Sequence, residues 1–254
     1  MKLQPLWSWL GYRLKARSPC AVRSSFMSSL VSEVFRDQND YTAYHRVAEM
    51  RRRLLHYHEV LHRDDLGSGS NGDIRINRFV KSSTIPTGTG KLLFRLVRYL
   101  EPDSILELGT GSGLSTAYMM LATPGVRCIT LEGCSETARL ASQQFQTEGI
   151  NAEVIVGPFD KTLPGSLAQL HPIEFAFIDG NHRHRHTVGY FRLLIQHCHE
   201  RSCLAFHDIH WSREMSRAWK TIIADERVTM SIDLFDVGLV FFPEQSKEHF
   251  VLRW

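Results

Sequence analysis

Between residues 104 and 224 the sequence alternates short apolar segments, each long enough for one strand, with longer segments of helical periodicity. This alternation is typical of a parallel sheet, because parallel neighbours must be joined by a long crossover that is usually a helix. We expect strands at 104–108, 127–131, 152–156, 175–178 and 203–206, and helices at 114–121, 136–148, 161–170, 186–198 and 213–224. The sequence therefore predicts an α/β fold with helices on both faces of the sheet.

The C-terminal end of the chain has a different pattern. Two apolar segments, 228–235 and 237–242, are separated by about one residue, which is too short for a helical crossover, so we expect them to pair antiparallel. A further strand is expected within 249–254. The predicted sheet is therefore mostly parallel and ends in an antiparallel C-terminal hairpin.

The first 66 residues are expected to form a helical N-terminal extension to a domain spanning 67–254. Apolar residues recur at three- and four-residue intervals around 44–58, as on one face of an amphipathic helix, and a Gly/Ser/Asn cluster at 67–72 interrupts regular structure. Residues 1–63 hold 11 Lys and Arg against 5 Asp and Glu. The run Arg51-Arg52-Arg53 is interpreted as a solvated helix face rather than a site for an acidic partner, and nucleic acid is not an expected partner.

The composition and the apolar runs indicate where in the cell the protein is expected and how its cysteines are expected to behave. The longest apolar runs are far shorter than the roughly 20 residues that cross a bilayer, and the first residues lack a secretory signal pattern, so we expect a cytoplasmic protein with no membrane partner. The 5 cysteines are odd in number and show no C-x-x-C spacing, which favours free thiols over disulfides or a zinc site. The sequence leaves a homodimer open.

A glycine-rich loop, Glu107-Leu108-Gly109-Thr110-Gly111-Ser112-Gly113, follows the first expected strand of the sheet. Ligands of open parallel sheets bind beyond the carboxyl ends of the strands, and Gly109, Gly111 and Gly113 let the backbone pass close to a ligand. Dinucleotide sites have the spacing G-x-G-x-x-G and face a pyrophosphate. Here the spacing is G-x-G-x-G, and the carboxylate of Glu107 suits the ammonium of S-adenosylmethionine better than a phosphate.

Two later strand ends carry residues suited to the rest of that cofactor. Glu132, at the end of the second strand, is placed to accept from two ribose hydroxyls, although a surface acid is an equal alternative. Phe159 and Asp160, after the third strand, offer an aromatic face and a carboxylate for adenine. Asp160 is equally placed to cap the next helix.

The order and spacing of E-L-G-T-G-S-G, L-E-G, G-P-F-D and F-I-D-G-N-H resemble class I S-adenosylmethionine-dependent methyltransferases. Within that class, F-I-D-G-N-H and F-H-D-I-H-W are most similar to the branch of catechol-type O-methyltransferases and to uncharacterised bacterial members. The resemblance covers about residues 91–242. It implies a Rossmann-like, seven-stranded sheet with its last strand antiparallel. It also implies cofactor contacts from Glu107, Gly109, Thr110, Gly111, Gly113, Glu132, Phe159, Asp160 and Asp179.

The reacting end of such a site lies after the fourth and fifth strands. In the catechol-type relatives an acid after the fourth strand and an acid plus amide after the fifth hold a magnesium ion, which lowers the pKa of the acceptor hydroxyl. Asp179 matches the first ligand and Asp208 the second, but Ile209 stands where the amide is expected. A divalent metal, Mg²⁺ or a softer ion held with His207, is therefore one hypothesis. A proton acceptor among His182, His207 and His210 is the other.

Other residues near this end carry weaker signals. The histidines and arginines of 182–186 favour a solvated or anion-facing loop over a metal site, because alternating positions point in different directions. Of these residues only His182, the nearest to Asp179, is kept as a candidate. Trp211 is equally suited to line the acceptor site or to pack on the following helix. Phe79, Lys81 and Ser82 are expected to line the acceptor site from the N-terminal side.

The resulting hypothesis is methyl transfer from S-adenosylmethionine to an oxygen of a small molecule, with Asp179, His182 and His210 as catalytic candidates. Two alternatives stay open. One is a Rossmann-type nicotinamide oxidoreductase, which the glycine spacing and Glu107 disfavour. The other is a non-catalytic binder that kept the cofactor site, suggested by the altered residues after the fifth strand.

Overall fold

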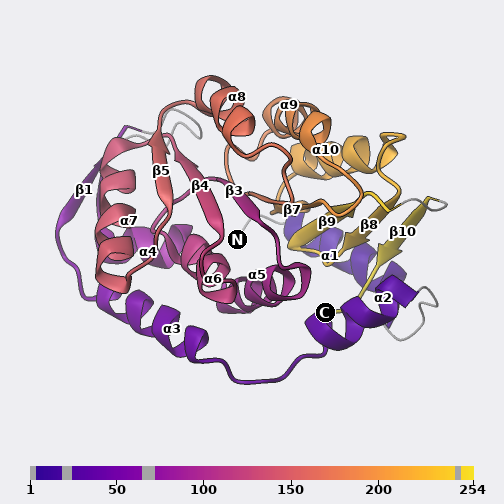
Figure 1. The fold of residues 1–254 in the computed structure, drawn as a ribbon, viewed down its shortest axis with the longest axis horizontal. Coiled ribbons are helices and arrows are strands. Elements are labelled where there is room, and N and C mark those ends of the chain that lie inside the picture. Colours follow the sequence, from indigo (N-terminus) through magenta and orange to yellow (C-terminus); the bar gives the residue numbers. More distant parts are fainter. Residues whose placement is uncertain (1–3, 19–24, 65–71, 244–246) are drawn as a thin grey trace.

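A computed structural model describes residues 4–18, 25–64, 72–243 and 247–254. Its main element is an eight-stranded sheet in the order β10-β8-β9-β7-β6-β3-β4-β5 (Figure 1). The strands are β3 (Ser104–Leu108), β4 (Arg127–Glu132), β5 (Glu153–Val156), β6 (Phe175–Ile178), β7 (Cys203–His207), β8 (Met230–Asp233), β9 (Val237–Phe241) and β10 (Glu248–Val251).

The predicted fold is confirmed, and the further strand that the sequence predicts near the C-terminus gives eight strands where the family resemblance implies seven. All neighbouring strands are parallel except β9, which runs antiparallel to both β7 and β8. The eighth strand is β10, which pairs parallel with β8 at the edge of the sheet. It overlaps the expected 249–254 segment and begins one residue before it.

Two layers of helices cover the sheet. On one face lie α5 (Thr87–Leu100), α6 (Leu114–Ala122) and α7 (Ser135–Glu148), and on the other α8 (Phe159–Gln169), α9 (His184–Leu194), the short 3-10 helix η3 (Ile195–His197) and α10 (Arg213–Ala224). Figure 1 shows α8, α9 and α10 above the sheet and α5 and α6 below it. Successive strand residues alternate between the two cores, so Ile105 packs in the first and Leu106 in the second.

The N-terminal part precedes this sheet and packs on its first helical layer. It contains α1 (Gln4–Lys15), α2 (Ser25–Leu30), the π-helix η2 (Val31–Phe35), α3 (Thr42–Leu55), β1 (Val60–Arg63), β2 (Gly72–Arg75) and α4 (Ile76–Ser83). β1 and β2 form an antiparallel pair, so residues 60–63, expected to belong to a helical extension, are a strand. Local periodicity does not reveal this strand, because its partner lies beyond the 67–72 break, most of which is outside the described residues.

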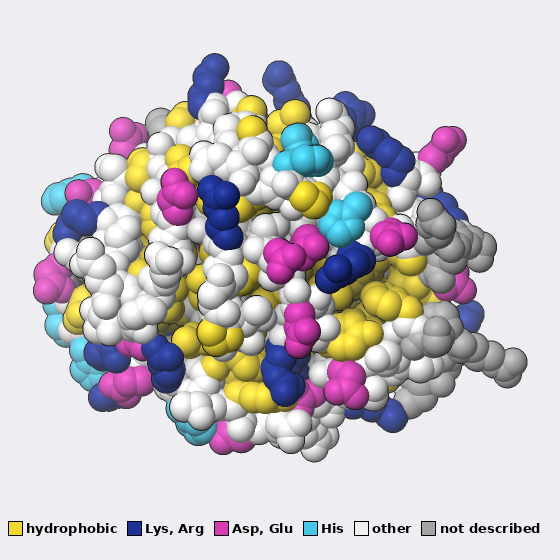
Figure 2. Space-filling model, viewed as in Figure 1, with side chains coloured by type: hydrophobic (Ala, Val, Ile, Leu, Met, Phe, Trp, Pro, Cys, Tyr) yellow, Lys and Arg dark blue, Asp and Glu magenta, His cyan; other side chains and the backbone are white. Residues whose placement is uncertain are grey.

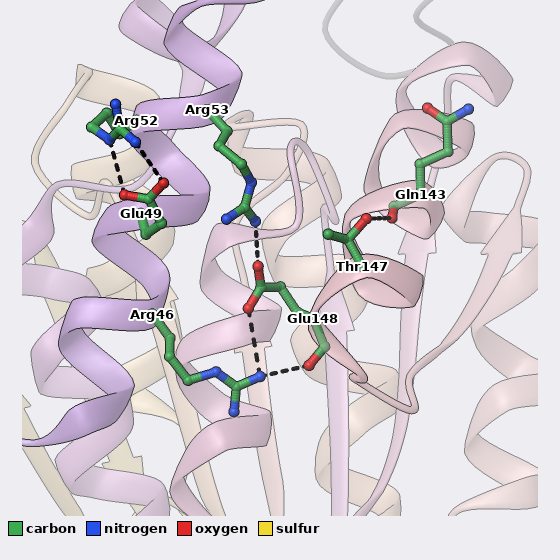
Figure 3. Close-up of polar contacts among 7 residues, drawn as sticks. All are labelled: Arg46, Glu49, Arg52, Arg53, Gln143, Thr147 and Glu148. Carbon is green, nitrogen blue, oxygen red and sulfur yellow. Dashed lines mark hydrogen bonds and ion pairs between the residues drawn. The ribbon is translucent and has the colours of Figure 1, made fainter.

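Ion pairs attach α3 to the end of α7 (Figure 3). Arg53 contacts one carboxylate oxygen of Glu148, and Arg46 lies 3.5 Å from the other and donates to the Glu148 carbonyl oxygen at 2.5 Å. Arg52 is exposed and pairs with Glu49 on its own helix. The interpretation of Arg51-Arg52-Arg53 as a solvated face is therefore correct for Arg52 and wrong for Arg53, which reaches a neighbouring helix.

Two further sequence-based expectations concern membrane-spanning helices and the state of the cysteines. Among the described residues, no helix is both long and apolar enough to cross a membrane. The described cysteines are free, as expected: Cys128, Cys134 and Cys203 are buried and Cys198 is partly buried. Cys20 lies outside the described residues.

Candidate active site

A cleft of about 980 Å³ opens at the carboxyl ends of the parallel strands. This is the place where an open parallel sheet binds its ligand, because the strand-to-helix turns leave backbone groups unpaired there. Its lining includes residues 82–86, 109–112, 132–134, 158–160 and 179–182, together with Arg63, Phe79, Ser115, Arg185, His186, Tyr190, His207, Asp208 and Trp211.

The glycine loop forms the floor of the cleft at the end of β3. Gly109 has φ +106°, and a Cβ there would lie 2.4 Å from the carbonyl oxygen of Asp179, so glycine is required by both conformation and space. Gly113 precedes α6 with φ +81°, and its Cβ would lie 2.6 Å from the ring of Phe145. Gly109, Thr110 and Gly111 line the cleft, whereas Gly113 lies below it and allows α7 to pack closely.

Glu107 lies beneath this loop rather than in the cleft lining. It is fully buried, and its Oε2 accepts from the hydroxyl of Thr130 at 2.6 Å and from Thr116. Oε1 has no hydrogen-bond partner among the described residues. Burial raises the pKa of Glu107 to about 7, although hydroxyl donors oppose the shift. Alternation along β3 explains the position, because Glu107 faces the α6 layer as Ile105 does.

Thr130 connects this buried acid to the loop, because its hydroxyl also lies 2.6 Å from the hydroxyl of Thr110. Glu107 is therefore placed to support the loop from below. Direct contact between Glu107 and a cofactor ammonium stays a prediction.

Glu132 lines the cleft at the end of β4, as expected. Its Oε2 accepts from the backbone N–H of Gly111 at 2.9 Å and its Oε1 from that of Cys134 at 3.0 Å. These bonds fix the carboxylate beside the glycine loop. Contact of this carboxylate with ribose hydroxyls stays a prediction.

Phe159 and Asp160 line the cleft next to this carboxylate. The ring of Phe159 lies 5.7 Å from that of Tyr190 and covers Gly180, where a Cβ would approach the ring to 2.5 Å. Pro158 occupies the N-cap position of α8, so Asp160 lies inside the first turn and is not the capping residue. The cap interpretation of Asp160 is wrong, and its side chain belongs to the cleft.

Four titratable side chains meet at the other end of the cleft. The Oδ1 of Asp179 lies 2.8 Å from Nδ1 of His207 and 3.7 Å from Nε2 of His182. Nδ1 of His182 lies 3.9 Å from Oδ2 of Asp208, and Nδ1 of His207 lies 3.8 Å from Oδ1 of Asp208. Residues 28 positions apart in sequence thus form one network, because β6 and β7 are adjacent parallel strands.

The electrostatics of this network favour opposite charges in contact. Burial works against ionisation of Asp179, but His207 and His182 hold its pKa below the usual value. Burial likewise works against a charged His207, but the Asp179 carboxylate raises the pKa of that imidazole to about 9. Burial raises the pKa of Asp208 against the influence of both histidines.

The backbone after β6 and β7 adopts unusual conformations to bring these groups together. Asn181, His182 and Asp208 have φ of 68°, 27° and 58°, in the region that favours glycine. Such conformations persist where the surrounding structure enforces them, and they concentrate at functional sites. Both loops therefore direct their side chains at a local conformational cost.

The donor set fits a divalent metal. Asp179, His182 and Asp208 each offer a ligand atom within 4.8 Å of the other two. Two carboxylates and an imidazole suit Mn²⁺, Fe²⁺ or Zn²⁺ as well as Mg²⁺. Ile209 is buried in the core and contributes no donor, so His182 takes the third position. The sequence indicated Asp179 and Asp208 as ligands with His207 as their partner and His182 as a proton acceptor, whereas the structure groups His182 with the two carboxylates.

His210 does not join this group. It is not part of the cleft lining, its Nε2 lies 2.7 Å from Oδ2 of Asp233, and its ring stacks on Phe235 at 5.4 Å. Trp211 does line the cleft and packs on His182 with ring centroids 5.7 Å apart. Of the two interpretations of Trp211, the structure supports the acceptor-side wall.

The N-terminal part also contributes to the cleft. Phe79 and Ser82 line it, as expected, whereas Lys81 does not. Sequence reasoning missed the rest of the segment 82–86 and missed Arg63. No motif marks either of them, because they reach the cleft through tertiary packing. The expected solvated loop at 182–186 is partly wrong, because residues 184–186 form the first turn of α9 and His182, Arg185 and His186 line the cleft.

Comparisons with known proteins agree with this geometry. Residues 106–209 match a family model described as a methyltransferase domain. A transmembrane O-methyltransferase homolog of Rattus norvegicus is 33% identical over 125 residues, covering 46% of this chain and 48% of the relative. Catechol O-methyltransferase of Mycobacterium tuberculosis is 34% identical over 110 residues, covering 42% and 48%. The chain thus spans about half the length of the curated relatives it matches.

Solved structures show the same fold. An S-adenosylhomocysteine-bound methyltransferase of Podospora anserina superposes with a TM-score of 0.61 at 15% identity, covering 88% of this chain and 98% of that one. The O-methyltransferase TomG of Streptomyces achromogenes, solved with S-adenosylmethionine, gives 0.58 at 18% identity, covering 86% and 94%. At these identities the likeness concerns the fold alone.

The sheet order, the glycine loop and the strand-end carboxylates define an α/β fold with a ligand cleft at the carboxyl ends of its parallel strands. Over residues 106–209 the chain is similar to the methyltransferase-domain family, and over 110 residues it is similar to a catechol O-methyltransferase.

Proposed function

We propose that this protein transfers the methyl group of S-adenosylmethionine to a hydroxyl oxygen of a small molecule. The observation that carries the proposal is the network of Asp179, His182, His207 and Asp208 at one end of a cleft whose other end is the glycine loop with Glu132. The part of the cleft with the glycine loop suits a nucleoside, and the part with the four-residue network suits a group that must lose a proton.

Binding and alignment account for much of the expected catalysis. The sulfonium is already a good leaving group, so the protein has to hold the acceptor oxygen in line with the methyl carbon. The Gly109–Gly111 backbone and the Glu132 carboxylate hold the cofactor. Trp211, which lines the same cleft, contacts the acceptor. The trisubstituted sulfur leaves as a neutral thioether, so positive charge disappears from the site during the reaction.

The proton of the hydroxyl must leave as the new bond to carbon forms. His182 is placed to accept it, because its imidazole is partly exposed in the cleft, with a side-chain exposure of 25%, between the carboxylates of Asp179 and Asp208. Those carboxylates stabilise the imidazolium that results. A divalent metal held by Asp179, Asp208 and His182 would supply a different route, by lowering the pKa of the hydroxyl.

The first experiment measures transfer of isotopically labelled methyl from S-adenosylmethionine to a panel of catechols and monophenols. Labelled O-methyl product supports the proposal. Binding of S-adenosylhomocysteine in calorimetry without transfer to any acceptor would indicate a non-catalytic binder. Binding of NAD or NADP in place of S-adenosylhomocysteine would indicate an oxidoreductase.

Two treatments separate the proton routes. Full activity in a chelator, lost in His182→Ala, assigns the proton to the imidazole. Activity lost in the chelator and restored by Mg²⁺ or Mn²⁺ assigns the acidification of the hydroxyl to a metal.

A further inference from the structure

One wall of the cleft comes from the N-terminal part of the chain. Ser82, Ser83, Thr84, Ile85 and Pro86 all line the cleft, and we call them the 82–86 wall. The wall joins α4 to α5, before the first strand of the sheet. The strand ends supply the groups assigned to the cofactor and to the proton, so the acceptor is the remaining ligand for this wall to contact.

A single arginine holds the wall from outside the cleft. Nη1 of Arg51 donates to the hydroxyl oxygen of Thr84 at 2.8 Å, and Nη2 donates to the carbonyl oxygen of Ile85 at 2.5 Å. Thr84 in turn donates to the carbonyl oxygen of Val80 at 2.6 Å, in the last turn of α4. Arg51 is not itself part of the cleft lining. It therefore connects α3 to two consecutive residues of the wall.

The environment of Arg51 differs from that of an ordinary surface arginine. The side chain is partly buried, and among the described residues no carboxylate forms an ion pair with it. Burial lowers the pKa of Arg51, so keeping its guanidinium charged in this position costs free energy. The two guanidinium nitrogens that bind the wall form a rigid planar fork, which fixes direction as well as distance.

The helix that carries Arg51 is itself attached to the core. Arg46 and Arg53, on the same helix, bind Glu148 at the end of α7 (Figure 3). The buried ring of Tyr44 packs against Phe94 of α5 with centroids 5.1 Å apart. Because α3 is fixed to α5 and α7, the position of the wall is fixed relative to the glycine loop as well.

We infer that Arg51 is a positioning residue, which sets the place of the 82–86 wall and thereby the fit of the acceptor. The inference rests on the proposed function, because it assigns the wall to the acceptor of methyl transfer. Arg51 touches neither reacting group. It acts through the Thr84 hydroxyl and the Ile85 carbonyl.

The test compares Arg51→Met, Arg51→Lys and the matched control Arg52→Met. Methionine keeps the unbranched apolar stem of the side chain and removes both donors, and lysine keeps the charge but offers a point donor in place of the fork. Arg52 is exposed and contacts Glu49 on its own helix, so its loss removes a neighbouring charge without touching the wall.

For an acceptor that turns over, we expect Arg51→Met to raise KM about tenfold or more, because small displacements in a binding site are costly. We expect kcat and the dissociation constant of S-adenosylhomocysteine to change less than about threefold. Arg51→Lys should recover part of the loss, and Arg52→Met should match the parent protein. Unchanged KM, or parallel losses in KM, cofactor affinity and thermal midpoint, would overturn the inference.

A second measurement needs no acceptor. Amide hydrogen exchange with S-adenosylhomocysteine bound should be faster at residues 83–85 in Arg51→Met than in Arg52→Met, with the glycine loop unchanged. Equal exchange at these amides in the two variants would also overturn the inference. If the parent protein methylates no acceptor while the exchange difference is present, the proposed function fails and the wall is still held by Arg51.

Discussion

The two ends of the cleft differ in what they are made of. At the cofactor end, backbone groups dominate: Gly109 and Gly111 have positive φ, and the Glu132 carboxylate is fixed by two backbone N–H groups. At the reacting end, the side chains of Asp179, His182, His207 and Asp208 form one charged network. Here the positive φ values belong to residues other than glycine, namely Asn181, His182 and Asp208.

This difference indicates how each end responds to change. A site built from backbone depends on close approach, so added atoms disturb it more than altered charge does. A site built from charged side chains depends on ionisation and on the partners that hold each charge. Four experiments test this comparison, and they are ordered from the largest expected effect to the smallest.

Asp179→Asn should have the largest effect. It removes the charge that pairs with His207 and His182, and we expect methyl transfer to fall about 10³-fold, as when proton handling is lost. Affinity for S-adenosylhomocysteine should fall less than about tenfold, because the glycine loop and Glu132 remain. Labelled-methyl assays measure the rate of transfer, and calorimetry measures the affinity for S-adenosylhomocysteine.

The matched control for this substitution is Asp225→Asn, which breaks an ion pair with Arg227 away from the cleft. Asp225→Asn should leave the rate of methyl transfer and the affinity for S-adenosylhomocysteine unchanged. Equal losses of transfer and of cofactor affinity in Asp179→Asn would mean that the two ends do not act separately.

Gly109→Ala and Gly111→Ala test whether the cofactor end tolerates an added Cβ atom. Both positions have positive φ, which costs about 1–2 kcal/mol for a residue with a Cβ. At Gly111 the added Cβ meets no atom within 4 Å, whereas at Gly109 it meets the Asp179 carbonyl oxygen at 2.4 Å. We expect Gly109→Ala to lose about 2 kcal/mol more stability than Gly111→Ala and to bind S-adenosylhomocysteine far more weakly.

Urea unfolding and calorimetry on the two alanine variants measure these differences. Similar losses in the two variants would show that backbone strain, and not the approach of β6 to the loop, makes glycine necessary here.

Glu107→Gln tests a titratable group beneath the backbone-built end. Burial raises the pKa of Glu107 from 4.5 to about 7, so the native state binds this proton more tightly than the unfolded chain does. The resulting stabilisation is fully present below about pH 4.5 and is lost as the pH rises to about 7. It amounts to about 3 kcal/mol.

Glutamine has no such titration, so urea unfolding of Glu107→Gln at pH 5 and pH 8 should differ less than that of the parent protein. Glu136→Gln, at an exposed ion pair with Arg139, is the control and should keep the parent dependence. The same pH dependence in Glu107→Gln and the parent protein would contradict the assignment.

Glu148→Gln should have the smallest effect. It weakens the attachment of α3 through Arg46 and Arg53, and the free energy of unfolding should fall by about 1 kcal/mol, because the pairs are partly exposed. Glu49→Gln, at a pair within α3, should leave stability unchanged. Thermal unfolding measures both. A loss of cofactor affinity in Glu148→Gln would show that the cofactor end depends on the N-terminal part.

The sequence predicted the cofactor end better than the reacting end. The strand before Gly109, the glycine spacing and Glu132 all lie within short segments whose pattern is local. The reacting end combines β6, β7 and two strained loops. Sequence spacing indicated Asp179, Asp208 and His182, but it placed His210 with them, whereas the structure pairs that imidazole with Asp233.

The N-terminal part was the least predictable. β1 forms only because β2 pairs with it, and helical periodicity assigns Arg51 to a solvated face although it binds Thr84 and Ile85. Helical periodicity indicates which residues share a face. It does not indicate which neighbouring segment that face contacts.

The amino-acid sequence by itself therefore determined the alternating α/β order, the antiparallel end of the sheet and the glycine loop with the family resemblance that it carries. These features depend on periodicity, glycine conformation and motif spacing, all of which act between residues near in the chain. Only the tertiary structure decided that Glu107 lies beneath the loop, that His182 and not His210 joins the two aspartates, and that α3 holds the 82–86 wall. Each of these depends on contacts between distant segments, where packing and burial select one arrangement among many.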